Sequence, residues 1–268
     1  MKTTFGFIGC GNMGGALASA VAKSVGGSSL LVCDALSEKA EALAAALGGA
    51  IGTACEIAET CEYVFLGVKP QGFEALFEEI RPVLQNRDQA PVLVTMAAGI
   101  SMDAVEKMAA CDSAVIRIMP NTPVSVGEGM ILYTANAKTT EEQLSCFAHA
   151  LSEAGKLDRL PEEKIDAASA LSGCGPAFVY LFAEALADGA VECGLSREKA
   201  NLYAAQTLAG AAKLLLTSGK HPGELKDAVC SPGGTTIAGV HALETGAFRA
   251  SAIEAVTAAY EKTLKLKK

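Results

Sequence analysis

The sequence predicts an α/β fold in which a doubly wound parallel sheet is followed by an all-α domain. Short apolar runs alternate with helical runs over residues 1–160, and a glycine-rich turn follows the first apolar run. From Pro161 onward only helical patterns remain. Strands that are apolar throughout are typical of a parallel sheet covered by helices on both faces. We therefore expect one domain at 1–160 and a second, helical one at 161–268.

Composition narrows the possible classes of protein. The chain is 50% hydrophobic and carries a formal net charge of −8, which argues against nucleic acid or an anionic membrane as a partner. Its nine cysteines are scattered without zinc-ligand spacing, so we expect no metal and free thiols in a reducing compartment. The apolar stretch 167–183 is broken by Gly173, Gly175 and Pro176, which favours a buried helix over a membrane span. Residues 1–4 lead directly into the first apolar run without a signal-peptide pattern, so we expect a cytoplasmic protein.

The first predicted strand, Phe5–Ile8, is followed by a G-x-G-x-x-G turn that begins a helix. The turn consists of Gly9, Cys10, Gly11, Asn12, Met13 and Gly14. Gly9 suits the tight turn, Gly11 lets backbone approach a pyrophosphate, and Gly14 allows the helix to pack closely on the strand. The helix start offers N–H groups to phosphates. The pattern predicts a Rossmann-type dinucleotide site, although a glycine turn that serves the backbone alone is the alternative.

An acidic residue follows the second predicted strand, Leu30–Cys33. Asp34 lies 20 residues after Gly14, where an acid commonly hydrogen-bonds the adenosine ribose 2′-OH. A carboxylate there repels a 2′-phosphate, so Asp34 by itself favours NADH. The alternative is a solvated turn aspartate. Ser37 is expected to cap a helix that ends at Leu47.

Further strands and helices complete the predicted sheet. Strands are expected at 63–68, 92–96, 114–119, 131–133 and 156–160, and helices at 73–84, from Ser101, and at 140–154. Three of the strands end in loops that contain Lys69-Pro70-Gln71, Ala97-Ala98-Gly99 and Pro120-Asn121-Thr122-Pro123. Carboxyl ends of parallel strands meet at one crevice, which is where ligands bind. Taken singly, each loop could also be an ordinary turn.

The second half is predicted to be entirely helical. The helical runs cover 162–171, 176–193, 197–217, 221–229, 235–245 and 248–266. Their Ala, Leu and Val residues lie on more than one face, which is more apolar surface than about a hundred residues can bury alone. We therefore expect a homodimer formed through this half.

One loop of the helical half has the composition of an anion site. Ser231-Pro232-Gly233-Gly234-Thr235-Thr236 immediately precedes a helix. Two glycines and two hydroxyls at a helix N-terminus are suited to hold an anion. A plain capped helix start would need Ser or Thr but not the preceding Pro-Gly-Gly.

Several motifs together resemble those of one enzyme family. They are Gly9–Gly14, Val68-Lys69-Pro70-Gln71, Met119–Pro123, Leu171–Ala177 and Ser231–Thr236. On these motifs, in order and along the whole chain, the sequence resembles the Δ1-pyrroline-5-carboxylate reductases, the last enzymes of proline biosynthesis. The resemblance implies an oxidoreductase that uses NADPH or NADH to reduce L-1-pyrroline-5-carboxylate to L-proline.

The resemblance also implies roles for individual residues. It places pyrophosphate on Gly9–Gly14, and it places the ribose and nicotinamide along Val68, Lys69, Pro70, Ala97 and Ala98, with Asn121 in the same cofactor site. The substrate would be bound by Glu162, Gly234, Thr235 and Thr236. Its carboxylate would lie on the last three, with Thr236 near the ring nitrogen as the catalytic residue and Glu162 close by. Family members form dimers, and some assemble into decamers. This chain departs from many relatives at two positions: they carry Asn where this chain has Ala228, and they lack an acid where this chain has Asp34.

The expected chemistry needs little from the protein beyond orientation. A cyclic imine is basic enough to take a proton from water, so the iminium can accept hydride without a strong protein acid. Thr236 would then position the ring nitrogen, with proton relay as a further role. The three histidines are expected to be structural.

Two other functions are alternatives to the reductase. A β-hydroxyacid dehydrogenase-like oxidoreductase would need a lysine on the long helix after the glycine turn, where this chain has Val179 among apolar residues. A non-enzymatic NAD(H)-sensing regulator would need a DNA-binding element, and no basic element of that kind is evident.

Overall fold

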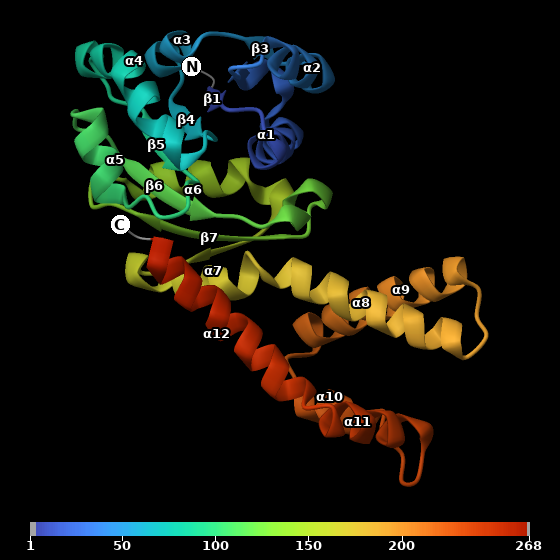
Figure 1. Cartoon of the computed structure of the whole chain (residues 1–268). Coiled ribbons are helices and arrows are strands. Elements are labelled where there is room, and N and C mark those ends of the chain that lie inside the picture. The colour runs from blue at the N-terminus through green and yellow to red at the C-terminus, as the bar shows by residue number, and fades with distance from the viewer. Residues whose placement is uncertain (1–3, 267–268) are drawn as a thin grey trace. The chain divides into compact units, whose positions relative to one another are not determined.

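The computed structural model describes residues 4–266 and divides them into two compact units (Figure 1). Within the described residues, unit 1 comprises 4–173 and 260–266, and unit 2 is Cys174–Ala259. Helix α7 (Glu162–Ser172) therefore groups with the first unit, although the composition change lies before it, near residue 161.

Among residues 4–266, unit 1 holds one eight-stranded sheet with the order β3-β2-β1-β4-β5-β6-β7-β8. The strands are β1 (Phe5–Ile8), β2 (Leu30–Cys33), β3 (Ala50–Ile51), β4 (Tyr63–Leu66), β5 (Val92–Thr95), β6 (Val115–Met119), β7 (Gly129–Ala135) and β8 (Gly155–Arg159). The six strands from β3 to β6 are parallel. The chain leaves β1 toward β2 on one side and returns through β4 on the other. That reversal makes the β1–β4 boundary the switch point at which such sheets bind ligands.

Helices cover both faces of this sheet, as a doubly wound fold requires (Figure 1). One core cluster joins the sheet to α1 (Asn12–Val25), α2 (Ser37–Leu47) and α6 (Glu141–Ala150). The other joins it to α3 (Ala54–Thr60), α4 (Phe73–Asn86) and α5 (Met102–Ala109). Successive strand residues alternate between the clusters: Phe7 lies in the first and Ile8 in the second. The continuous apolar runs thus reflect burial on both faces.

The sheet departs from a purely parallel arrangement at β7. Strand β7 runs antiparallel to β6, and β8 is parallel to β7. Between β6 and β7 the chain forms only the short 3-10 helix η3 (Thr122–Val126). A parallel crossover needs about a dozen residues or more. The connection is too short for one, so the chain turns back.

Three local features differ from the sequence expectations. Strand β3 and helix α3 are additional elements. Helix α3 packs on β1 because Gly6 has no side chain: a Cβ there would lie 2.2 Å from Ile57 Cγ2. The expectation that Ser37 caps α2 is wrong, because the N-cap residue is Leu36, without a side-chain cap bond, and Ser37 is the first helical residue.

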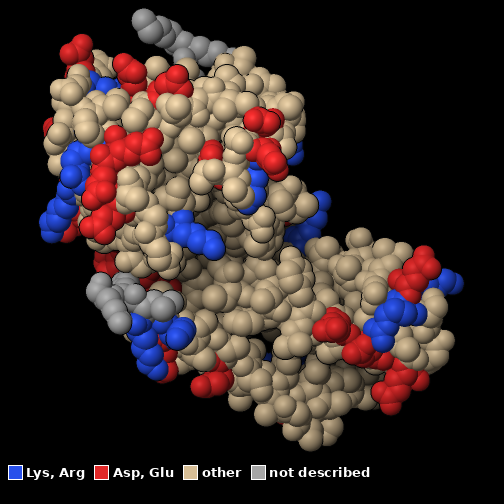
Figure 2. Space-filling view, turned by 45° about the horizontal axis from the view of Figure 1, so that its top comes forward, with Lys and Arg blue, Asp and Glu red and all other residues tan. Residues whose placement is uncertain are grey.

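Unit 2 consists of helices that bury little of their own apolar surface. They are α8 (Gly175–Glu192), α9 (Arg197–Ser218), α10 (Pro222–Ala228), α11 (Thr235–Thr245) and α12 (Phe248–Leu266), whose last residues belong to unit 1. Ala187, Ala200 and Ala204 are buried between α8 and α9. Leu181 and Leu216 remain 69% and 70% exposed. Figure 2 shows broad areas of the helical part without charged side chains.

Within the described residues, the stretch Glu162–Glu192 is the one candidate long and apolar enough to cross a membrane by length and composition. A turn at Gly173–Cys174 separates it into α7 and α8. This break is the interruption that the glycines predict. The expectation of a buried helix is wrong for the single chain, because Ala170 is the one buried residue between 167 and 183.

Candidate functional site

The glycine turn after β1 is shaped by two close contacts and one open position. Gly9 has φ +104°, and a Cβ on it would lie 2.6 Å from the carbonyl carbon of Gly67. A Cβ on Gly14 would lie 2.1 Å from the Gly9 oxygen, whereas one on Gly11 would meet no atom within 4 Å. Packing therefore requires Gly9 and Gly14. Gly11 leaves open space, as the approach of a phosphate to backbone needs.

The N-terminus of α1 is free to receive an anion. Its N-cap residue is Gly11, which makes no side-chain cap bond, and its first turn carries no acidic residue. Such a terminus presents unsatisfied N–H groups and the positive end of the helix dipole. The residues Cys10, Asn12 and Met13 lie in or beside this turn. The turn therefore fits the pyrophosphate of a dinucleotide.

Asp34 lies beside the turn and is fixed by it. Its Oδ2 accepts a hydrogen bond from the Cys10 backbone N–H at 2.7 Å, and its Oδ1 accepts one from the Leu36 N–H at 2.9 Å. The Cys10 thiol donates to the Cys33 carbonyl at 3.3 Å. Burial, followed by the negative charge of Asp34, raises the pKa of the Cys10 thiol to about 11. The thiol is therefore protonated at neutral pH and is no nucleophile.

The carboxyl end of β4 lies against the glycine turn. The Gly67 N–H donates to the Ile8 carbonyl at 2.7 Å, which extends the pairing of β1 with β4. Val68 follows half-buried, and Lys69 is the exposed N-cap of the 3-10 helix η2 (Pro70–Gly72). The structure thus brings the predicted cofactor residues of these two strands together at the switch point.

The ends of β5 and β6 contribute differently. Ala97 is buried and Ala98 is exposed just after β5. The Asn121 amide, after β6, donates from Nδ2 to the Ser172 carbonyl at 2.9 Å and accepts at Oδ1 from the Met130 N–H at 2.9 Å. The Asn121 side chain thus fastens the loop after β6 to its neighbours.

A buried ion cluster joins β6 to α7. Arg117 pairs through Nη2 with Asp166 Oδ1 at 2.9 Å and through Nη1 with Glu162 Oε1 at 3.3 Å. The side chains of Arg117 and Asp166 are each 3% exposed. Glu162 Oε1 also accepts from the Met102 N–H at 3.0 Å, at the start of α5. Glu162 therefore links three elements: α7, on which it lies, β6 through Arg117, and α5 through Met102.

The sequence motifs assign no role to Arg117 or Asp166. The signal available was one arginine inside the otherwise apolar run 114–119. A charge buried in a strand needs an opposite charge beside it. A cavity of about 490 Å³ lies next to the cluster and is lined by Gly99, Ser101, Arg117, Glu162 and Glu163.

In unit 2, the loop Ser231–Thr236 forms a tight turn that ends in an uncapped helix start. The Gly234 N–H donates to the Ser231 carbonyl at 3.0 Å, with Pro232 and Gly233 (φ +69°) between them. Proline followed by a positive-φ glycine is the signature of a type II turn. Gly234 is the N-cap of α11 and makes no side-chain cap bond. Thr235 and Thr236 are exposed in the first turn of this helix.

Among the other chemically capable residues, His221 has a structural role. His221 Nδ1 accepts from the Gly223 N–H at 3.1 Å and so caps α10. All nine cysteines, which lie within residues 4–266, are free thiols. In that same range no group of three or more His, Cys, Asp or Glu residues could hold a metal ion.

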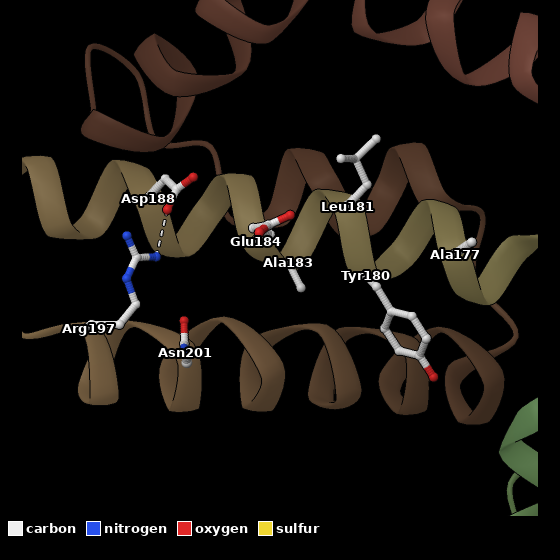
Figure 3. A pocket seen from close by; sticks show the side chains of 8 residues that line it. All are labelled: Ala177, Tyr180, Leu181, Ala183, Glu184, Asp188, Arg197 and Asn201. Atoms are coloured by element: carbon white, nitrogen blue, oxygen red, sulfur yellow. Dashed lines mark ion pairs between the residues drawn. The ribbon is translucent and has the colours of Figure 1, made fainter.

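A wide hollow lies between α8 and α9 within unit 2 (Figure 3). Its lining is Ala177, Tyr180, Leu181, Ala183, Glu184, Asp188, Arg197 and Asn201. Arg197 pairs with Asp188 at 2.6 Å across one end. None of the predicted site residues lines this hollow. Its walls are helix faces that carry both apolar residues and the polar side chains of Tyr180, Glu184 and Asn201 beside the Arg197–Asp188 pair.

Family models match both halves of the chain. Residues 162–266 match a model described as pyrroline-5-carboxylate reductase dimerisation. Residues 4–99 match a model described as NADP oxidoreductase, coenzyme F420-dependent. The first match covers the exposed apolar helices, and the second covers the glycine turn and the strand ends beside it.

Individual proteins match over the full length. The chain is 40% identical to a pyrroline-5-carboxylate reductase of Escherichia coli over 271 residues, which covers 100% of each. A pyrroline-5-carboxylate reductase structure from Coxiella burnetii superposes with a TM-score of 0.91 at 30% identity and 100% coverage of both chains. A pyrroline carboxylate reductase from Plasmodium falciparum with NADP bound gives 0.85 at 30% identity, also over 100% of each chain.

Proposed function

The chain belongs to the pyrroline-5-carboxylate reductase family, and from this premise we propose which of its residues carry out the reaction. The protein is an oxidoreductase that reduces pyrroline-5-carboxylate to proline with NAD(P)H. The nicotinamide cofactor supplies the hydride when bound. The protein must therefore hold two ligands at once and orient them.

We assign the cofactor to the carboxyl ends of β1, β2, β4, β5 and β6. The turn Gly9–Gly14 and the uncapped start of α1 take the pyrophosphate, which the open space at Gly11 supports. Asp34 faces the adenosine ribose. Val68, Lys69, Pro70, Ala97 and Ala98 line the rest of the site, and Asn121 holds the adjoining loop in place through its two hydrogen bonds.

We assign the substrate carboxylate to Gly234, Thr235 and Thr236. The observation that carries this assignment is the N-terminus of α11, which has a glycine N-cap, no side-chain cap bond and no acid in its first turn. Uncapped N–H groups at a helix start bind a carboxylate directly. The Thr236 hydroxyl positions the ring nitrogen, whose basicity lets it take its proton from water. Catalysis then rests mainly on orientation and exclusion of water.

Glu162 acts in this proposal through its neighbours rather than as an acid. Its Oε1 joins Arg117 to the Met102 N–H, and Met102 begins the helix that follows the Ala97–Ser101 loop. Holding this loop fixes one wall of the cofactor site. Glu162 is therefore a positioning residue: it holds the Ala97–Ser101 loop of the cofactor site.

The protein is a homo-oligomer, as the dimerisation region of its family implies. We propose that two chains form a homodimer through residues 161–268. Any larger assembly, such as a decamer, is built from this dimer. The exposed leucines of unit 2 and the open hollow between α8 and α9 support this proposal, because a second copy of the chain would bury these surfaces. The free thiols support a cytoplasmic location.

The substrate assignment is tested by kinetics with Thr236→Ala. Loss of a hydrogen bond to the substrate should lower kcat/KM for pyrroline-5-carboxylate roughly 10- to 100-fold. The dissociation constant of the reduced cofactor should be unchanged. Unsubstituted 1-pyrroline, which lacks the carboxylate, should be a poor substrate for the unmodified enzyme.

The matched control is Thr245→Ala. Thr245 lies at the other end of α11, where its hydroxyl donates to the His241 carbonyl at 3.0 Å. This variant should keep full activity. Equal losses of kcat/KM and cofactor affinity in Thr236→Ala, or equal rates with and without the carboxylate, would reject the assignment.

A further inference from the structure

We propose that Asp34 makes this enzyme select NADH over NADPH, by holding a fixed carboxylate at the position where the adenosine 2′ substituent is read. The inference rests on the proposed cofactor site at the glycine turn. It concerns the specificity of that site, not the reaction.

The geometry fixes the position of the carboxylate. Asp34 follows β2 directly, and its two oxygens accept backbone N–H groups from two different segments: Cys10 of the glycine turn and Leu36 at the N-cap of α2. Moving the side chain away to admit a phosphate would break two charge-assisted hydrogen bonds. The carboxylate therefore stays beside the turn whether or not a dinucleotide is present.

The same carboxylate can still bind a ribose. Each oxygen of an ionised carboxylate has two acceptor sites, and the backbone bonds occupy one on each. The remaining lone pairs can accept hydrogen bonds from ribose hydroxyls. A 2′-phosphate has no such proton to donate in its fully ionised form and carries a charge of about −1.5 to −2. The carboxylate thus accepts the diol and repels the phosphate.

The surrounding charges do not offset this repulsion. From residue 34 to residue 41 the chain has three acids, Asp34, Glu38 and Glu41, against the one base Lys39. Glu38 lies in the first turn of α2, where its charge already interacts with the positive end of the helix dipole. A site for a 2′-phosphate commonly has an arginine here. The charge balance at the end of β2 therefore favours NADH.

The test is direct binding of NADH and NADPH, measured by calorimetry without substrate. The unmodified enzyme should bind NADH at least about tenfold more tightly, which corresponds to roughly 1.4 kcal/mol. Asp34→Ser and Asp34→Asn should each reduce that ratio about tenfold or more, mainly by tightening NADPH. Asparagine has the shape of aspartate and keeps one oxygen acceptor for the backbone. The Asp34→Asn variant therefore tests loss of the charge without full loss of the hydrogen bonds that hold the turn. Melting temperatures report whether both variants are folded.

The control is Glu41→Gln, which removes one negative charge from the exposed side of α2, the helix that follows Asp34. It should change the NADH-to-NADPH ratio far less than either Asp34 variant does. Adenosine 2′-monophosphate should compete with NADH less well than adenosine 5′-monophosphate for the unmodified enzyme, and the difference should narrow in Asp34→Asn.

Three outcomes would overturn the inference. NADPH could bind the unmodified enzyme as tightly as NADH, or both folded Asp34 variants could keep the original ratio. Either result rejects the role of Asp34 and leaves the cofactor site intact. If neither dinucleotide binds, the cofactor assignment fails as well.

Discussion

Gly11 and Gly14 lie three positions apart in the same turn, yet they lack side chains for different reasons. At Gly14 the reason is packing, because a Cβ would lie 2.1 Å from the Gly9 oxygen. At Gly11 the surrounding space is open in the protein itself. The proposed pyrophosphate would use that space. One glycine serves the fold and the other the ligand.

Gly11→Ala and Gly14→Ala should therefore have different effects. Gly11 has φ −69°, which alanine adopts readily, so the melting temperature should change little while the dinucleotide dissociation constant rises tenfold or more. Gly14→Ala should destabilise the protein by about 1–3 kcal/mol, because backbone must shift to admit the methyl group. Thermal unfolding and calorimetric titration measure the two effects. A stable Gly11→Ala protein with unchanged affinity would show that the turn is structural only.

At the residue scale, the sequence allows some of the site to be predicted. The spacing from Gly14 to Asp34 follows from the geometry of a β-α-β unit, so the acid could be placed at the end of β2. Its bonds to Cys10 and Leu36 depend on how two loops meet in space, which spacing does not determine. The same limit applies to Asn121, whose amide makes two bonds within the protein.

At the element scale, the pairing of Arg117 with Asp166 holds α7 against the sheet. Both side chains are almost fully buried, so neither charge can be solvated if the other is removed, although Arg117 would keep its longer contact with Glu162 at 3.3 Å. Removing one member of a buried pair costs about 3–5 kcal/mol, although the intact pair contributes much less. The cluster therefore matters for the placement of α7 and of the α5 start that Glu162 contacts.

Asp166→Ala should lower the free energy of unfolding by at least about 1 kcal/mol and by no more than about 3–5 kcal/mol, because Glu162 remains beside Arg117, in urea titrations at fixed protein concentration. The matched control is Asp103→Ala, since Asp103 pairs with Lys107 at 2.6 Å with both side chains more than 70% exposed. Exposed pairs contribute little. Equal stabilities for the two variants would mean that the buried cluster does not hold α7.

Element positions were predictable where hydrophobic patterning alone decides them. The apolar runs of β1, β2, β5 and β6 and the helices of unit 2 lie within a few residues of the predicted ranges. Helix α3 has too little apolar periodicity to stand out, although its capping box of Thr53 and Glu56 is a readable start signal. The direction of β7 follows from the short connection before it, so loop length is the feature of the sequence that predicts this direction.

At the scale of the whole molecule, the helices of unit 2 need a partner. Their exposed leucines would remain in water in a single chain, and contiguous apolar surface of this kind marks an interface. The composition of the second half already indicates this need, because it has more apolar residues than its size can bury. Which helix faces pair with the second copy depends on packing geometry that patterning does not specify.

Leu181→Glu should weaken the oligomer, because a carboxylate in an apolar interface would be buried without a partner. Sedimentation at micromolar concentration should give a dimer or a larger assembly for the unmodified protein and a shift toward monomer for the variant. Ile51→Glu is the control, since Ile51 is a comparably exposed apolar residue on β3 of unit 1. A monomeric unmodified protein would contradict the proposed dimer.

The central claim is that this chain reduces pyrroline-5-carboxylate with a nicotinamide cofactor, and the reaction itself tests it most directly. The purified full-length protein is mixed with NADH or NADPH and pyrroline-5-carboxylate, and the loss of reduced-cofactor absorbance and the formation of proline are followed together. We predict turnover that requires the enzyme and both ligands, with one proline formed for each cofactor oxidised. Cofactor oxidation no faster than in the absence of pyrroline-5-carboxylate, with either cofactor, would contradict the account.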